Sequence, residues 1–143
     1  MGTYIMLHIE YRLKSGGEWK HVNFDSSFMT RGYSPLCAFL GLGGVEGHLP
    51  LRGLPEDITI DTRESIFHDE DYMDLDYYNY SWASSEEIES AVELAYDVMQ
   101  TQEDVKGNLR VLDEYLEWKG FIGYMKSMES SMRYECRAIY WFF

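Results

Sequence analysis

The chain has 143 residues, of which 45% are hydrophobic and 16% aromatic, and its formal net charge at pH 7 is −13. This composition predicts a single folded domain, residues 1–143, that is long enough to bury a core. A membrane protein is excluded because no run approaches the ~18 apolar residues of a membrane span. The N-terminus also lacks the pattern of a secretory signal, so we expect a soluble, intracellular protein.

The first 24 residues predict a β-hairpin. Residues 3–13 alternate apolar and polar side chains, which is typical of a half-buried strand. A Lys-Ser-Gly-Gly turn follows at 14–17, and residues 18–24 alternate again. His8 and His21 are thereby placed to pair across the hairpin at the surface.

The next segment predicts two short helices joined by a loop. Ser34 and Pro35 favour the start of a helix that ends at the glycines of 41–44. Residues 45–55 are rich in Gly and Pro and predict an ordered loop. Thr59 or Asp61 is then a suitable N-cap for a helix that runs through Ile66 or Phe67.

Residues 56–104 form an acidic block. They contain sixteen carboxylates and one base, Arg63, so their net charge is −15, whereas the rest of the chain sums to +2. Within this block, residues 68–80 interleave acids with aromatic rings, a pattern that would imitate the charge and stacking surfaces of nucleic acid. An ordinary acidic surface loop remains the alternative. The candidate contact residues here are Asp69, Glu70, Asp71, Asp74, Asp76, Tyr77 and Tyr78.

The second part of the block predicts an amphipathic helix. Ser84 and Glu87 have the spacing of a capping box, and an apolar stripe from Ile88 to Met99 follows with helical periodicity. No Lys or Arg lies three or four positions away from the acids on the opposite side, so we expect a line of carboxylates in solvent. That line consists of Glu86, Glu89, Glu93 and Asp97.

The C-terminal third predicts a second long helix and a final strand. Leu109, Leu112 and Leu116 belong to the helical pattern of residues 108–130. Residues 134–143 are aromatic and alternating, which favours a buried strand. The whole pattern predicts an α+β fold, in which the N-terminal hairpin and the C-terminal strand form an antiparallel sheet with helices packed on one face.

No motif in the chain indicates catalysis, a cofactor or a metal. The acids that begin at Asp69 lack the Gly and Glu positions of an EF-hand, and the four histidines are scattered without zinc-binding spacing. No phosphate loop or nucleophile motif occurs. A hydrolase of nucleic acid with so negative a charge would repel its own substrate. We therefore expect a protein that is not an enzyme.

Three short motifs stand out in the chain: Arg-Gly-Tyr-Ser-Pro-Leu-Cys-Ala-Phe-Leu at 31–40, Pro-Leu-Arg-Gly-Leu-Pro-Glu-Asp at 50–57, and Ser81-Trp82 before an acidic helix. Together they resemble a family of small phage and prophage proteins. The resemblance supplies no catalytic residues. It implies an accessory phage gene, and such genes often encode inhibitors of host defence.

These observations favour an inhibitor, of the anti-CRISPR or anti-restriction type, that binds a basic nucleic-acid-handling host protein through an acidic, DNA-mimicking surface. It would not contact nucleic acid directly. The alternative is a module that sequesters a nucleotide immune signal near the Gly-rich loop 41–55, and a third is a structural or regulatory phage protein. A homodimer is left open. Candidate ligand-binding residues for the nucleotide alternative are Arg31, Tyr33, His48 and Arg52.

Overall fold

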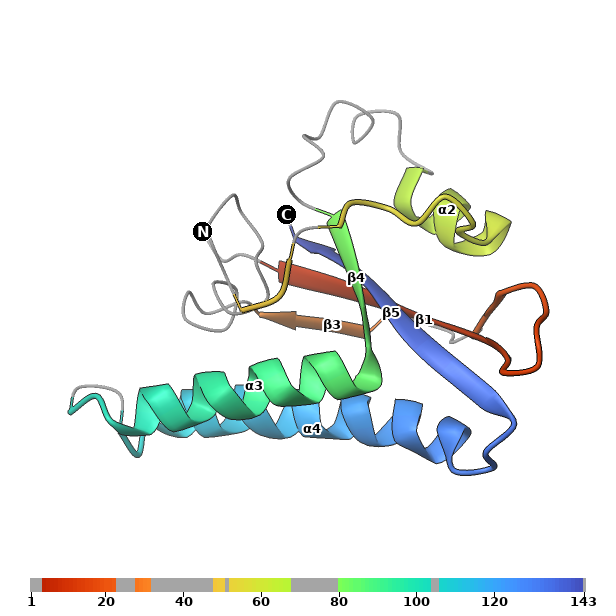
Figure 1. The fold of residues 1–143 in the computed structure, drawn as a ribbon. Helices are drawn as coiled ribbons and strands as arrows, with labels where there is room; N and C mark the ends of the chain where they lie inside the picture. Colours follow the sequence, from red (N-terminus) through yellow and green to blue (C-terminus); the bar gives the residue numbers. More distant parts are fainter. Residues whose placement is uncertain are drawn as a thin grey trace.

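The computed structural model describes residues 4–22, 28–31, 48–50, 52–67, 80–103 and 106–142. Within these ranges, five strands form one antiparallel sheet and three helices pack against it (Figure 1). This confirms the predicted α+β fold. The strands are β1 (Tyr4–Leu13), β2 (Lys20–His21), β3 (Phe28–Arg31), β4 (Tyr80–Ser84) and β5 (Tyr134–Phe142), and the helices are α2 (Ile60–Phe67), α3 (Ser85–Gln100) and α4 (Leu109–Glu129).

The two terminal strands, β1 and β5, form the centre of the sheet. They pair from Ile5 opposite Phe142 to Leu13 opposite Tyr134. β4 pairs with the other edge of β5, whereas β2 and β3 both lie along the second edge of β1. The β1–β2 pair confirms the predicted hairpin. The sequence patterns did not indicate β3 or β4.

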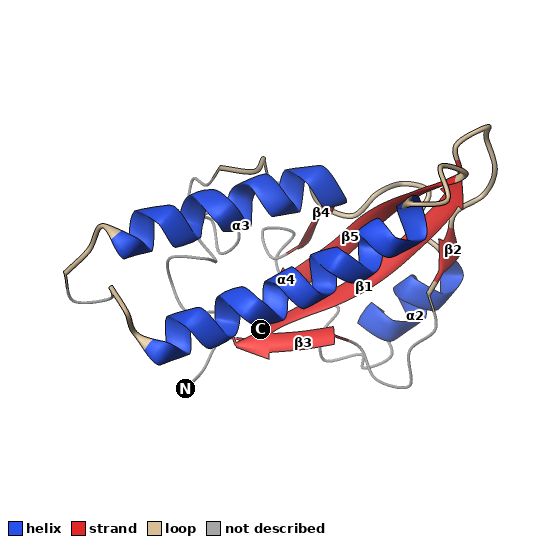
Figure 2. Ribbon diagram, turned by 90° about the horizontal axis from the view of Figure 1, so that it is seen from below, coloured by secondary structure: helices blue, strands red, loops and turns tan. Residues whose placement is uncertain are grey.

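One face of the sheet is covered by α3 and α4, which lie side by side (Figure 2). The predicted apolar stripe of α3 is buried there at Ile88, Ala91, Val92, Ala95 and Met99, whereas Val98, also predicted to face the core, is 37% exposed. Trp118 and Phe121 of α4 meet Ile5, Leu7 and other residues of the same core. The two long helices therefore lie on one face as the sequence predicted, but the third helix, α2, packs on the other.

The opposite face of the sheet is also covered, and this corrects the prediction that residues 3–13 form a half-buried strand. On that face, Ile66 of α2 packs with Ile139 and Trp141 of β5. His8 and Glu10 of β1 point the same way and are buried. Because helices or loops cover both faces, the polar side of β1 is buried as well as its apolar side.

Helix α2 confirms the capping prediction made from its sequence. Thr59 precedes the helix, and its hydroxyl oxygen accepts a hydrogen bond of 3.1 Å from the backbone N–H of Thr62. Its C-terminal limit at Phe67 also agrees with the prediction. The helix predicted at 33–40 lies outside the described residues.

Candidate functional site

The acidic helix α3 has the start that the sequence predicted. The Ser84 hydroxyl accepts a bond from the backbone N–H of Glu87, and the Glu87 carboxylate accepts one from the backbone N–H of Ser84. This capping box fixes where the helix begins, and the buried apolar stripe fixes its rotation. The positions of the acidic side chains on the outer surface follow from these two constraints.

The predicted line of solvated carboxylates is corrected at its centre. Glu93 forms an ion pair of 2.7 Å with Lys119, and Glu89 forms one of 3.2 Å with Lys126. Both lysines come from α4, which runs antiparallel beside α3. The spacing of charges within α3 could not indicate these lysines, because they lie on another helix. The prediction required both carboxylates to be fully exposed, and neither of them is.

Glu93 is the most tightly held of these acids. The Tyr115 hydroxyl donates to its carboxylate at 2.9 Å, and the Tyr115 ring stacks on Tyr96 with ring centres 3.9 Å apart. The bond from Lys119 lowers the pKa of Glu93 below its ordinary value. Glu93 thus links the two helices, while Glu86 and Asp97 are exposed and form no ion pair within the described part of the chain.

The remaining predicted contact residues are described only in part. The acidic and aromatic residues at 69–78, and Tyr33, lie outside the described residues. Arg31 is described through its backbone in β3. His48 is exposed, and Arg52 lines an open groove on the face of the sheet opposite α3 and α4.

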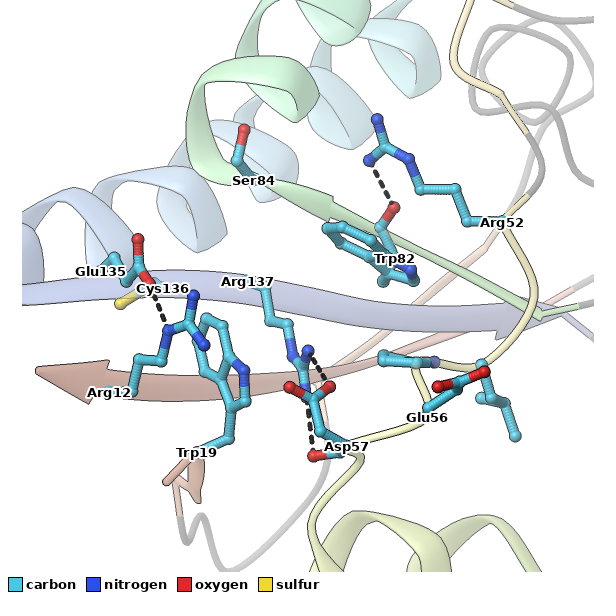
Figure 3. Close-up of a pocket in the computed structure, with 12 residues that line it drawn as sticks. Arg12, Trp19, Arg52, Glu56, Asp57, Trp82, Ser84, Glu135, Cys136 and Arg137 are labelled. Atoms are coloured by element: carbon cyan, nitrogen blue, oxygen red, sulfur yellow. Dashed lines mark hydrogen bonds and ion pairs between the residues drawn. The ribbon is translucent and has the colours of Figure 1, made fainter. Parts of the chain in front are cut away.

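That groove has a volume of about 650 Å³ and is lined by three arginines and two tryptophans (Figure 3). The Trp19 ring lies between Arg12 and Arg137, whose guanidinium carbons are 4.4 and 4.0 Å from its centre. Arg52 lies 4.5 Å from the centre of the Trp82 ring. Such contacts fix aromatic rings and cations against one another.

Arg137, which lines the groove, forms a buried ion pair with Glu10. Arg137 donates to Glu10 at 2.9 Å from Nε and 2.6 Å from Nη2, and it donates to Asp57 at 2.8 Å from Nη1. Glu10 also accepts bonds from the backbone N–H of Thr59 and the hydroxyl of Thr62. The network therefore connects β1, β5 and the segment before α2, and Arg137 lowers the pKa of Asp57.

The other two arginines of the groove are also paired with carboxylates. Arg52 donates to both carboxylate oxygens of Glu87, so the two charges offset each other. Its Nη1 also donates to the backbone carbonyl of Trp82 at 3.0 Å. Arg12 pairs with Glu135. Because each of the three arginines has an acidic partner, the groove offers little uncompensated positive charge for an anion.

The sequence held a signal for this groove that the alternation pattern did not reveal. Glu10 and Arg12 lie on the polar side of β1 in the alternating pattern of residues 3–13, but their partners on β5 follow only from the strand register, in which Glu10 lies opposite Arg137 and Arg12 opposite Glu135. These cross-strand pairs have opposite charges, which is favourable in an antiparallel sheet. Trp19 reaches them from the turn before β2.

The groove is also lined by Cys136, whose thiol does not ionise at neutral pH. Burial raises the pKa of the Cys136 thiol to about 12, so the thiol stays protonated at neutral pH.

Within the described ranges, no cluster of three or more His, Cys, Asp or Glu side chains is arranged to hold a metal ion. Among the described helices, none combines the length and apolar character needed to cross a lipid bilayer.

The chain matches no protein-family model, no curated protein and no solved structure. The resemblance to small phage proteins therefore stays a prediction.

Proposed function

We propose that the protein is a phage- or prophage-encoded inhibitor of a host defence system and acts by binding rather than by catalysis. Its target would be a basic, nucleic-acid-handling protein, and its binding surface the acidic layer formed by α3 and α4. The observation that carries the proposal is the charge of α3, which has five carboxylates and no base. The phage origin and the host target rest on the resemblance at residues 31–57.

The charge of the helical layer survives the ion pairs between its helices. α4 contributes four carboxylates and three bases, so the two helices together have a net charge of −6, in which Glu87 is paired with Arg52 and Glu114 is only 4% exposed. Glu86 and Asp97 are exposed near the two ends of α3. A nucleic-acid-binding protein presents Lys and Arg to phosphates, and the same residues would be attracted to this layer. Such attraction accelerates association and weakens as salt is added.

Charge reversal on α3 tests the proposal. We would change Glu86 and Asp97 together to Lys and, as a control with the same change in charge, Glu18 and Glu64, which are exposed outside the helical layer. Each protein would be immobilised on beads and incubated with a nuclease-treated bacterial lysate. The proteins that the beads retain would then be identified by mass spectrometry. We expect the native protein and the control variant to retain a DNA-binding protein, and the α3 variant to lose it. Short duplex DNA should displace that protein from the beads.

The affinity for the identified target, measured at two salt concentrations, then gives the size of the effect. We expect the α3 variant to bind at least tenfold more weakly, which corresponds to about 1.4 kcal/mol. Exposed substitutions usually change stability by less than about 0.5 kcal/mol, so both variants should melt close to the native protein. Equal affinity of the two folded variants would show that the acidic layer is only a solvated surface.

Sequestration of a nucleotide is a second candidate, and the groove around Trp19 is the observation that favours it. Arg52 lies in this groove with two further arginines and with aromatic rings that suit a base. The candidate is weaker because all three arginines are paired with carboxylates. Calorimetric titration with a cyclic dinucleotide is the direct measurement, and an Arg52→Met variant is the specificity control.

A further inference from the structure

The outer face of α4 carries an exposed apolar stripe. Leu109, Leu112, Leu116 and Tyr124 are 73%, 36%, 55% and 39% exposed, respectively. At about 100° per residue, they fall within one third of the helix circumference. Their spacing of three, four and eight residues spans four turns, or roughly 22 Å along the helix. Exposed apolar side chains that gather on one helix face mark an interaction surface more often than scattered ones do.

The fold does not need this stripe. α4 is held to the sheet by the opposite side of the helix, where Val111, Trp118, Phe121, Ile122 and Met125 are buried. Seen from below, α4 lies in front of the sheet with its outer face toward the viewer (Figure 2). The leucines that the sequence pattern grouped with the core residues of α4 therefore face away from the core.

Two glycines give the stripe a low point where another backbone can come close. Gly120 and Gly123 lie in line with the leucines, and a Cβ atom added at either position would meet nothing within 4 Å. Glycine lowers helix stability by about 1 kcal/mol relative to alanine, so two glycines in one exposed face are unfavourable for the isolated helix. The same positions allow close approach of a bound chain.

The charges beside the stripe select its occupant. Asp113 is exposed within the arc of the stripe, and the flank away from α3 carries Glu117 and Arg110, both exposed. On the other flank, Lys119 and Lys126 are paired with acids of α3. The layer stays negative even without Glu87, which is paired with Arg52, and the buried Glu114, so a second copy of this chain would be repelled, whereas a basic segment would be attracted.

We propose that the stripe Leu109, Leu112, Leu116 and Tyr124 is the docking site for a basic amphipathic helix of the partner. The helix would place its apolar side along the stripe, approach most closely at Gly120 and Gly123, and set Lys or Arg against Asp113 and the acidic surface of α3. An apolar centre with a charged rim is the usual anatomy of such an interface. The basic character of this helix rests on the proposed function; the position of the stripe does not.

The test uses a synthetic 18-residue amphipathic helix with leucines on one side and lysines on its flanks as the probe. Calorimetric titration would measure its affinity for the native chain, for Leu112→Gln/Leu116→Gln, and for Ile60→Gln. Ile60 is 74% exposed on α2 and so is a matched apolar control away from the stripe. We expect the double leucine variant to bind roughly tenfold more weakly and the control to bind like the native chain.

A second variant guards against loss of folding. Gly120→Gln should stabilise α4, because glutamine is a better helix former and the space is open. It should nevertheless weaken peptide binding by obstructing the close approach. Equal binding by all variants overturns the docking site. Concentration-dependent dimers that the leucine substitutions abolish overturn it in favour of self-association.

The same measurements distinguish failure of the proposed function from failure of the docking site. If Glu86→Lys/Asp97→Lys leaves binding of the lysine peptide unchanged while Leu112→Gln/Leu116→Gln weakens it, the stripe stands and α3 is not part of the contact. A peptide with glutamine in place of lysine should bind several-fold more weakly than the lysine peptide. Equal binding of the two peptides would overturn the basic occupant.

Discussion

Replacing Arg137 with Met should destabilise the protein strongly, because it leaves the buried Glu10 carboxylate without its counter-ion. The side chain of Glu10 has no exposed surface and that of Arg137 is 6% exposed, so water cannot substitute for the lost partner. Removing one member of such a pair costs about 3–5 kcal/mol. For a chain of this length we expect the melting temperature to fall by roughly 10–20 °C.

The structure offers a variant that should recover much of this loss. In Glu10→Gln/Arg137→Met the buried charge is gone, while the Gln carbonyl can still accept the bonds from Thr59 and Thr62. Urea denaturation of the single and double variants measures the difference in free energy of unfolding. A neutral, hydrogen-bonded side chain is far less costly to bury than an unpaired charge.

Arg12→Met is the matched control. Arg12 also pairs with a glutamate of β5 and also contacts Trp19, but it and Glu135 are each 37% exposed. An exposed pair of this kind contributes less than about 1 kcal/mol. The reasoning is refuted if Arg137→Met costs no more than Arg12→Met, or if the double variant is as unstable as the single one.

Two further predictions concern pH and the start of α3. Burial, together with the neighbouring His21, lowers the pKa of His8 from 6.5 to about 4. Above pH 6.5 His8 is neutral in both the folded and the unfolded state. Between pH 6.5 and 4 only the unfolded state takes up a proton, so the free energy of unfolding should fall by about 3 kcal/mol. Urea denaturation of His8→Gln at several pH values should show a shallower decrease of this free energy with falling pH. Ser84→Ala should lower the free energy of unfolding by about 1 kcal/mol in the same assay, and Ser84→Gly by a few tenths, because Ser84 caps α3.

The features that could be predicted from the sequence are those that neighbouring residues determine. Ser84 and Glu87 are three positions apart, and Thr59 and Thr62 likewise, so the geometry of one helical turn fixes their bonds. The alternation of residues 134–142 and the helical period of α3 follow from the same local geometry. His8 and His21, whose Nδ1 and Nε2 atoms are 2.9 Å apart, were found because a hairpin has few registers, although His8 is buried rather than at the surface.

The candidate sites depended on distances that the sequence does not contain. Lys119 is 26 positions from Glu93 and Arg137 is 127 from Glu10, so only the packing of α4 beside α3 and of β5 beside β1 brings these charges together. The sequence by itself determined where α2, α3 and α4 begin, that β1 and β5 are strands, and how much negative charge the chain carries. The tertiary structure decided which carboxylates are neutralised, which remain in solvent, and that the leucines of α4 face outward, because each depends on the position of a neighbouring element.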